Sequence, residues 1–64
     1  MKLREFNFNS IIVPALSIFV DGKEIAIGFI GEVLRQIPIG CADYEIERTN
    51  YFFDVFVIRL KSTK

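Results

Sequence analysis

Histidine is absent from this 64-residue sequence, and cysteine occurs only once. Without histidine the chain lacks the commonest general base and metal ligand. A single cysteine, Cys41, excludes an intramolecular disulfide and with it a secreted, disulfide-stapled miniprotein. We therefore expect a reducing, cytoplasmic location, and we expect Cys41 to be a small buried or half-buried residue.

Net charge and long hydrophobic runs are also lacking. Eight Lys and Arg residues balance eight Asp and Glu residues, so no global field attracts a polyanion, and non-specific nucleic-acid binding is disfavoured. The longest uncharged stretch, Phe6 to Val20, contains Asn, Ser and Pro residues. A membrane-spanning helix needs ~20 mostly apolar residues, so no membrane span is predicted.

Bulky apolar side chains are abundant, since 52% of the residues are hydrophobic and 14% are aromatic. A chain of this length buries only ~60% of the surface that it exposes when unfolded, and its stability as a monomer is marginal. We expect residues 1–64 to form one domain and some apolar side chains to contact another chain, either a second copy or a different protein.

The N-terminal half predicts a strand followed by a hairpin. Residues Lys2 to Asn9 alternate apolar and polar side chains, which is typical of a strand with one buried face. Asp21-Gly22 lies between two β-rich runs and favours a two-residue turn with positive φ at both positions.

This turn sets the expected register of the first hairpin. With Val20 opposite Lys23, Ile18 lies opposite Ile25, and a single aliphatic face results. Its members are Leu16, Ile18, Val20, Ile25 and Ile27. The other face carries Ala15, Ser17, Phe19, Glu24, Ala26 and Gly28, which suits either solvent or close approach of another layer.

From Phe29 to Ile37 the apolar spacing changes to that of an amphipathic helix of about two turns. Pro38 ends this helix, because the residue before a proline is pushed out of the α region. We expect the apolar side of the helix to lie on the aliphatic face of the hairpin.

The C-terminal part predicts a second hairpin, with residues 43–48 and Tyr51 to Leu60 as strands and Thr49-Asn50 as the turn. A two-residue loop places Ile46 opposite Phe53 but sets Glu45 against Asp54, a conflict that a three-residue loop would remove. The last strand is apolar on both sides. It should be central in its sheet or lie in an oligomer interface.

The predicted fold is therefore a small α+β domain in the order β-β-β-α-β-β. Its sheet is expected to be antiparallel, built from the N-terminal strand and two hairpins, with one short helix packed on one face.

Two sets of residues are candidates for binding a partner, on the apolar last strand and along an acidic edge. They are Phe52, Phe56 and Ile58, and Asp43, Glu45 and Glu47. The carboxylates could bind a divalent cation, but alternating acids on a strand usually form its solvated face. We predict no catalytic residue, no metal and no cofactor. The basic residues Lys2, Arg4, Arg59 and Lys61 are expected to lie away from the acidic edge.

The sequence favours a non-enzymatic protein-interaction module that binds or blocks a partner protein and self-associates. By analogy, small proteins without motifs suit accessory or inhibitor roles, such as those encoded by phages or mobile elements. The alternative is a single-stranded nucleic-acid-binding module, in which aromatic side chains of the sheet stack on bases beside cations. Its candidates are Tyr44, Tyr51, Phe52, Phe53 and Phe56 with Arg48, Arg59 and Lys61.

Overall fold

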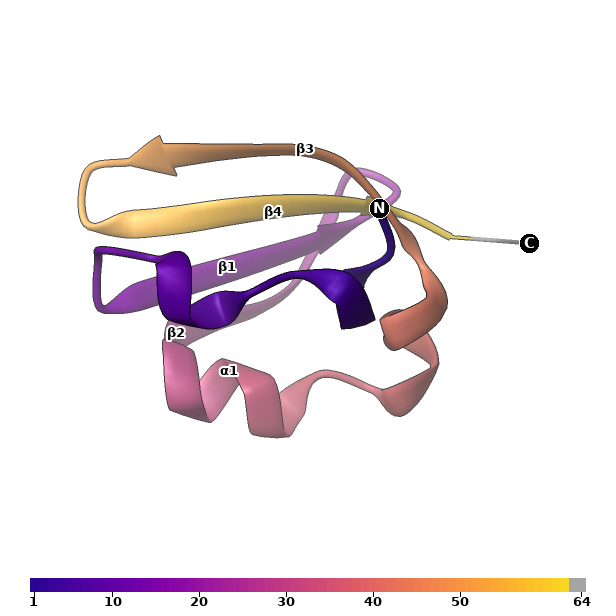
Figure 1. Cartoon of the computed structure of the whole chain (residues 1–64), viewed down its shortest axis with the longest axis horizontal. Helices are drawn as coiled ribbons and strands as arrows, with labels where there is room; N and C mark the ends of the chain where they lie inside the picture. The colour runs from indigo at the N-terminus through magenta and orange to yellow at the C-terminus, as the bar shows by residue number, and fades with distance from the viewer. Residues whose placement is uncertain (63–64) are drawn as a thin grey trace.

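The computed structural model describes residues 1–62. In it the chain forms a four-stranded sheet with one α-helix on one face of the sheet (Figure 1). The strands are β1 (Ala15–Val20), β2 (Lys23–Phe29), β3 (Glu45–Phe52) and β4 (Val55–Lys61), and the helix is α1 (Ile30–Gln36). Three short 3₁₀-helices complete the described part: η1 (Leu3–Glu5), η2 (Phe8–Ser10) and η3 (Ile39–Asp43). The predicted α+β class is confirmed.

The sheet is mixed, so the prediction of an antiparallel sheet is wrong in one respect. Its strand order is β2-β1-β4-β3, and the two central strands, β1 and β4, run parallel. Each outer strand pairs antiparallel with its hairpin partner. Strands that are buried on both faces favour the centre of a sheet, and β4 takes that position as one of the two predicted alternatives.

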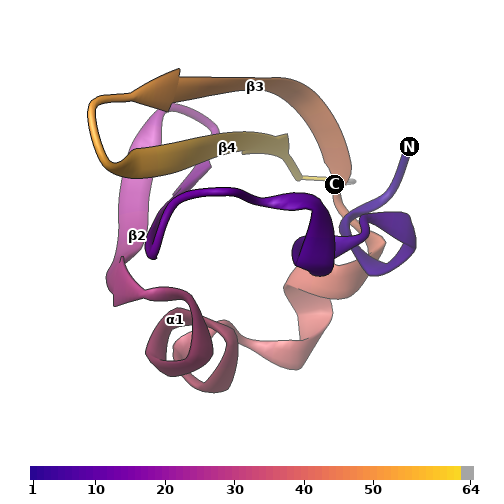
Figure 2. The ribbon, with the colours of Figure 1, turned by 60° about the vertical axis from the view of Figure 1, so that its left-hand side comes forward.

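The predicted strand from Lys2 to Asn9 is absent. This segment forms η1 and η2 and crosses the sheet on the side where α1 also lies (Figures 1 and 2). The Asn7 side chain accepts a hydrogen bond from the backbone N–H of Asn9 at 3.0 Å, a local bond that competes with strand pairing. Phe6 and Phe8 pack edge-to-face, and Phe6 stacks on Phe56 with 5.7 Å between ring centroids.

The predicted turn at Asp21-Gly22 is confirmed, with φ of 51° and 86° and Val20 opposite Lys23. Beyond the turn the predicted register is wrong, because the pairing shifts between Ile18 and Phe19. Ile18 therefore lies opposite Ala26, and Leu16 lies opposite Gly28.

The physical reason for this register is the packing of α1. A Cβ on Gly28 would lie 3.8 Å from Cγ2 of Val33, in van der Waals contact, so a bulky side chain there would push the helix away. Small residues of β2 face the helix, while Ile25 and Ile27 are exposed. The predicted aliphatic face thus keeps its β1 members and loses those of β2.

We expect Gly22→Val to lower the free energy of unfolding by about 1 to 2 kcal/mol, because a β-branched residue is strained at a φ of 86°. Chemical denaturation measures this loss. Gly22→Asn is the control, since asparagine tolerates the left-handed region and should cost less. Equal unfolding midpoints for the wild type and Gly22→Val would contradict the turn.

The predicted helix is confirmed as α1, which begins at Ile30 and ends at Gln36. Ile37 is already extended before Pro38, as expected for a residue that precedes proline. Val33 is completely buried, whereas Leu34 is 41% exposed. Only a narrow side of this short helix therefore enters the core.

The second hairpin has a different turn from the predicted one. Strand β3 continues through Thr49-Asn50, and the chain reverses at residues 53–54, where Phe53 has a φ of 54°. Ile46 lies opposite Leu60 rather than Phe53, and Glu45 lies opposite Lys61. This register removes the predicted contact of Glu45 with Asp54, but it places Arg48 opposite Arg59.

The hydrophobic core lies between the sheet and the layer formed by α1 and the 3₁₀-helices. Its buried members lie on the helix-covered face of β1, β2 and β4 or reach it from the opposite layer: Leu3, Leu16, Ile18, Ala26, Val33, Cys41, Phe56, Ile58 and Leu60. Because side chains alternate along a strand, every second residue of β1 and β4 points to the other face. That other face carries the candidate site.

Candidate functional site

The sheet face opposite α1, here called the open face, carries three rows of side chains that run across all four strands. The strand registers define these rows, since directly paired residues point to the same side. The charged row consists of Arg48, Arg59, Phe19 and Glu24. The middle row consists of Asn50, Val57, Ser17 and Ile27. The apolar row consists of Phe52, Val55, Ala15 and Phe29.

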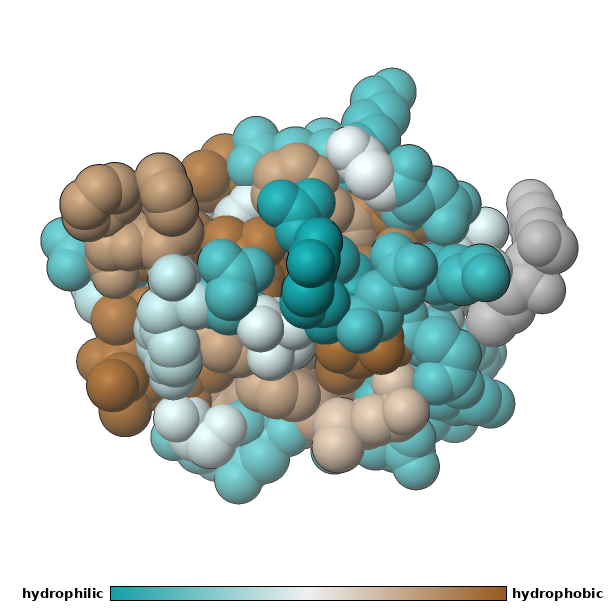
Figure 3. Space-filling model, turned by 90° about the horizontal axis from the view of Figure 1, so that it is seen from above, coloured by the Kyte–Doolittle hydropathy of each residue, from teal (hydrophilic) through white to brown (hydrophobic). Residues whose placement is uncertain are grey.

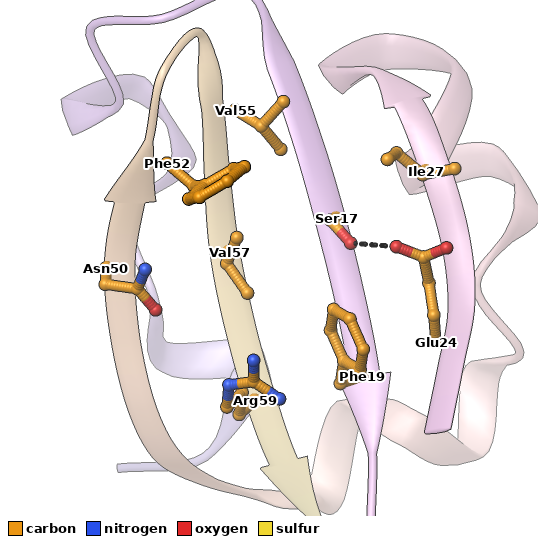
Figure 4. A pocket seen from close by; sticks show the side chains of 9 residues that line it. All are labelled: Ser17, Phe19, Glu24, Ile27, Asn50, Phe52, Val55, Val57 and Arg59. Atoms are coloured by element: carbon orange, nitrogen blue, oxygen red, sulfur yellow. Dashed lines mark hydrogen bonds between the residues drawn. The ribbon is translucent and has the colours of Figure 1, made fainter. Parts of the chain in front are cut away.

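A shallow hollow of about 430 Å³ lies over the centre of these rows (Figure 4). Its floor contains Ser17 and Val57, which are only 2% and 8% exposed because neighbouring side chains surround them. The side chains of Phe52, Ile27, Phe19 and Arg59 stand around this floor in Figure 4. A concave, mainly apolar surface with a few polar groups has the usual character of a binding site.

Within the charged row, the two arginines lie on β3 and β4, and the glutamate lies on β2 at the other end of the row. The guanidinium carbon of Arg59 lies 4.5 Å from the centroid of the Phe19 ring, a cation–π contact. On the β2 side, the hydroxyl of Ser17 donates a hydrogen bond to Oε2 of Glu24 at 2.8 Å. Arg48 is paired directly opposite Arg59, so two positive charges are neighbours on β3 and β4.

The apolar row ends in exposed aromatic rings. Phe52 and Phe29 are 62% and 64% exposed, and Ile27 of the neighbouring row is 56% exposed. Phe53, in the β3–β4 turn, packs edge-to-face on Phe52 with 4.6 Å between centroids. Figure 3 shows apolar surface gathered at the end of the molecule where Figure 1 places this turn. Apolar groups gathered on a surface in this way mark an interaction site.

The structure separates the three apolar residues that the sequence analysis assigned to partner binding. Phe52 lies on the open face, whereas Phe56 and Ile58 are 6% and 0% exposed and belong to the core. The alternation of β4 explains this correction, because Val55 and Val57 take the open face and Phe56 and Ile58 take the helix-covered face. Phe56 and Ile58 cannot contact a partner in this fold.

The predicted acidic edge lies beside the N-terminal segment, which corrects the expectation that the basic residues lie elsewhere. Arg4 forms a salt bridge with Asp43, and the N-terminal amine of Met1 lies 3.1 Å from Oε2 of Glu45. Backbone hydrogen bonds hold this segment in place, from Leu3 N–H to the Tyr44 carbonyl and from Ile46 N–H to the Met1 carbonyl. Intramolecular cations therefore offset much of the acidic charge.

Glu47, the remaining residue of the acidic edge, is exposed and lies where the β3–β4 register shifts. Within residues 1–62, no three His, Cys, Asp or Glu side chains are grouped closely enough to hold a metal ion. Cys41 lies in the core, and burial raises the pKa of its thiol.

Glu24 and Ile27 of the open face were not among the sequence candidates, and Arg59 was a candidate only for the nucleic-acid-binding alternative. The alternation of the first hairpin did group Ser17, Phe19 and Glu24 on one face. No local signal could join Arg59 to them, since that contact depends on the parallel pairing of β1 with β4. Ile27 was missed because the register shift in β2 moves it to the open face.

In the part of the chain that the structure describes, no helix has the length and apolarity needed to cross a lipid bilayer. No family model matches the sequence, and no curated protein and no solved structure is significantly similar to it.

Proposed function

We propose that this protein is a non-enzymatic interaction module that binds a partner protein through its open face. The observation that carries the proposal is the group of exposed apolar side chains on the open face, namely Phe52 and Ile27 at the hollow and Phe29 at the end of the apolar row. Aromatic side chains beside a buried floor are typical of residues that dominate protein interfaces. We further propose a cytoplasmic location and an accessory or inhibitory role, in which the open face occupies a surface of its partner.

Single-stranded nucleic acid is the second candidate, because Arg48, Arg59 and the ring of Phe52 lie on the same face. Two features favour a protein partner instead. The Arg59 guanidinium lies over the ring of Phe19 and occupies the position that a stacked base would take. The carboxylate of Glu24 lies beside the same hollow and would repel phosphate groups.

Affinity capture from cells that express the protein tests the proposal. We expect Phe52→Glu to abolish capture of the partner, since a charge placed within an apolar contact is desolvated without compensation. Ile12→Glu is the matched control, because Ile12 is 86% exposed and precedes β1 outside the open face. It should leave capture unchanged.

Loss of the partner with Ile12→Glu and its retention with Phe52→Glu would place recognition elsewhere on the molecule. Nuclease treatment separates the two candidate functions. If the captured material is nucleic acid, its binding should weaken steeply as salt is raised, because phosphate contacts release counterions. A nuclease-resistant protein partner supports the proposal.

A further inference from the structure

The charged row carries opposite charges at its two ends. Arg48 is on edge strand β3 and Glu24 is on edge strand β2, with β4 and β1 between them. Three spacings between neighbouring strands separate the two residues by ~14 Å, and among the described residues no salt bridge joins them. Each side chain is exposed on the same side of the sheet and is available to a second molecule.

We propose that the open face binds a second copy of this chain, stacked face to face about a two-fold axis parallel to the strands. This inference rests on the proposed function only in taking the open face as the binding surface. Such an axis exchanges β2 with β3 and β1 with β4, while it keeps each row at the same height along the strands. Every row therefore meets its own reversed copy.

In the charged row this operation makes two identical ion pairs. Arg48 of each copy meets Glu24 of the other, and Arg59 of each copy approaches Phe19 of the other. Ser17 already binds one carboxylate oxygen of Glu24, which restricts the orientation of that side chain. A surface that is complementary to its own reversed copy is the requirement for a symmetric dimer.

The other two rows add mainly apolar contacts. In the apolar row, Phe52 meets Phe29 of the other copy, and Val55 meets Ala15. In the middle row, Asn50 meets Ile27, and the hollow of one copy, with Ser17 and Val57 on its floor, faces the hollow of the other. In the apolar row a valine thus faces an alanine near the axis, and aromatic rings face each other at the rim, as apolar side chains do between stacked sheets.

The alternative axis, which lies between the sheets but perpendicular to the strands, lacks this complementarity. It would place the charged row over the apolar row and bury Arg48 and Glu24 against aromatic rings without opposite charges. Unpaired charges are costly to desolvate, so this arrangement is disfavoured. The distribution of charge therefore selects the axis parallel to the strands.

The size of the face fits a weak dimer. Four strands cover a width of ~19 Å, and the three rows with their side chains extend over ~20 Å along the strands. The flat footprint is thus ~400 Å² per copy, and the two contoured surfaces together bury ~1,000 Å², the lower end for specific interfaces. We therefore expect a dissociation constant of the dimer between about one and several hundred micromolar.

Sedimentation equilibrium of the full chain from 5 to 500 µM tests the proposal. The wild type should dimerise, and Glu24→Lys and Arg48→Glu should each weaken dimerisation at least tenfold, because both ion pairs become like-charge contacts. An equimolar mixture of the two variants should regain dimers, since a mixed pair restores two opposite-charge contacts. Glu32→Lys and Arg35→Glu are the controls, as both positions are exposed on α1.

A wild type that stays monomeric at 500 µM overturns the proposed dimer. The proposed function would still stand if a different protein is captured and Phe52→Glu abolishes that capture. Dimers that resist both reversals, or a mixture that stays monomeric, also overturn it. Circular dichroism of each variant checks folding. Recovery in the mixture excludes misfolding as the cause, because two misfolded chains would not complement each other.

Discussion

Replacement of Phe56 with alanine is expected to lower the free energy of unfolding by about 3 to 5 kcal/mol. The ring is 6% exposed and contacts two other aromatic rings, with centroid distances of 5.7 Å to Phe6 and 4.8 Å to Tyr51. Removal of the ring leaves a cavity where the N-terminal segment meets β4. A domain of this size has little stability to spare, so we expect a large unfolded fraction at 37 °C.

Phe52→Ala is the matched control, because Phe52 lies on the same hairpin and is 62% exposed. It should change the free energy of unfolding by less than about 1 kcal/mol, as most surface substitutions do. Urea denaturation of the two variants measures the difference. Equal losses of stability would show that the two rings do not lie on opposite faces of the sheet.

Val33→Asp is the second substitution with a large expected effect. It should lower the free energy of unfolding by more than about 3 kcal/mol, because it buries an unpaired charge. Val33 is the completely buried residue of α1, and this seven-residue helix depends on packing, because helices this short are unstable on their own. We expect loss of α-helical signal in circular dichroism and a lower thermal midpoint.

Leu34→Asp is the control on the same helix. Leu34 is 41% exposed, so the carboxylate of an aspartate at this position can remain in water. The free energy of unfolding should fall by less than about 1 kcal/mol. A Leu34→Asp variant that unfolds as readily as Val33→Asp would show that a different side of α1 packs on the sheet.

Strand β4 connects stability with the proposed binding surface. Its alternate residues Phe56, Ile58 and Leu60 form the centre of the core, while Val55, Val57 and Arg59 contribute to the hollow on the open face. Substitutions of Phe56, Ile58 and Leu60 should therefore act on folding, and those of Val55 and Arg59 on association. The two properties can be measured separately on one strand.

Part of the candidate site was accessible from the sequence. The alternation of residues in the first hairpin placed Ser17, Phe19 and Glu24 together, and the two-sided apolar pattern of β4 indicated either a central strand or an oligomer interface. The same pattern could not tell which of Phe52 and Phe56 is buried. That choice depends on which face of the sheet α1 and the N-terminal segment cover.

Local signals in the sequence determined the α+β class, the turn at Asp21-Gly22 and the helix that ends before Pro38, because backbone preference and hydrophobic period act over a few neighbouring residues. Only the tertiary structure decided the parallel pairing of β1 with β4, the register shifts in both hairpins and the turn at residues 53–54. These features depend on contacts between distant segments: α1 packs on Gly28, and the ring of Phe6 covers Phe56. The same contacts leave the opposite face of the sheet open.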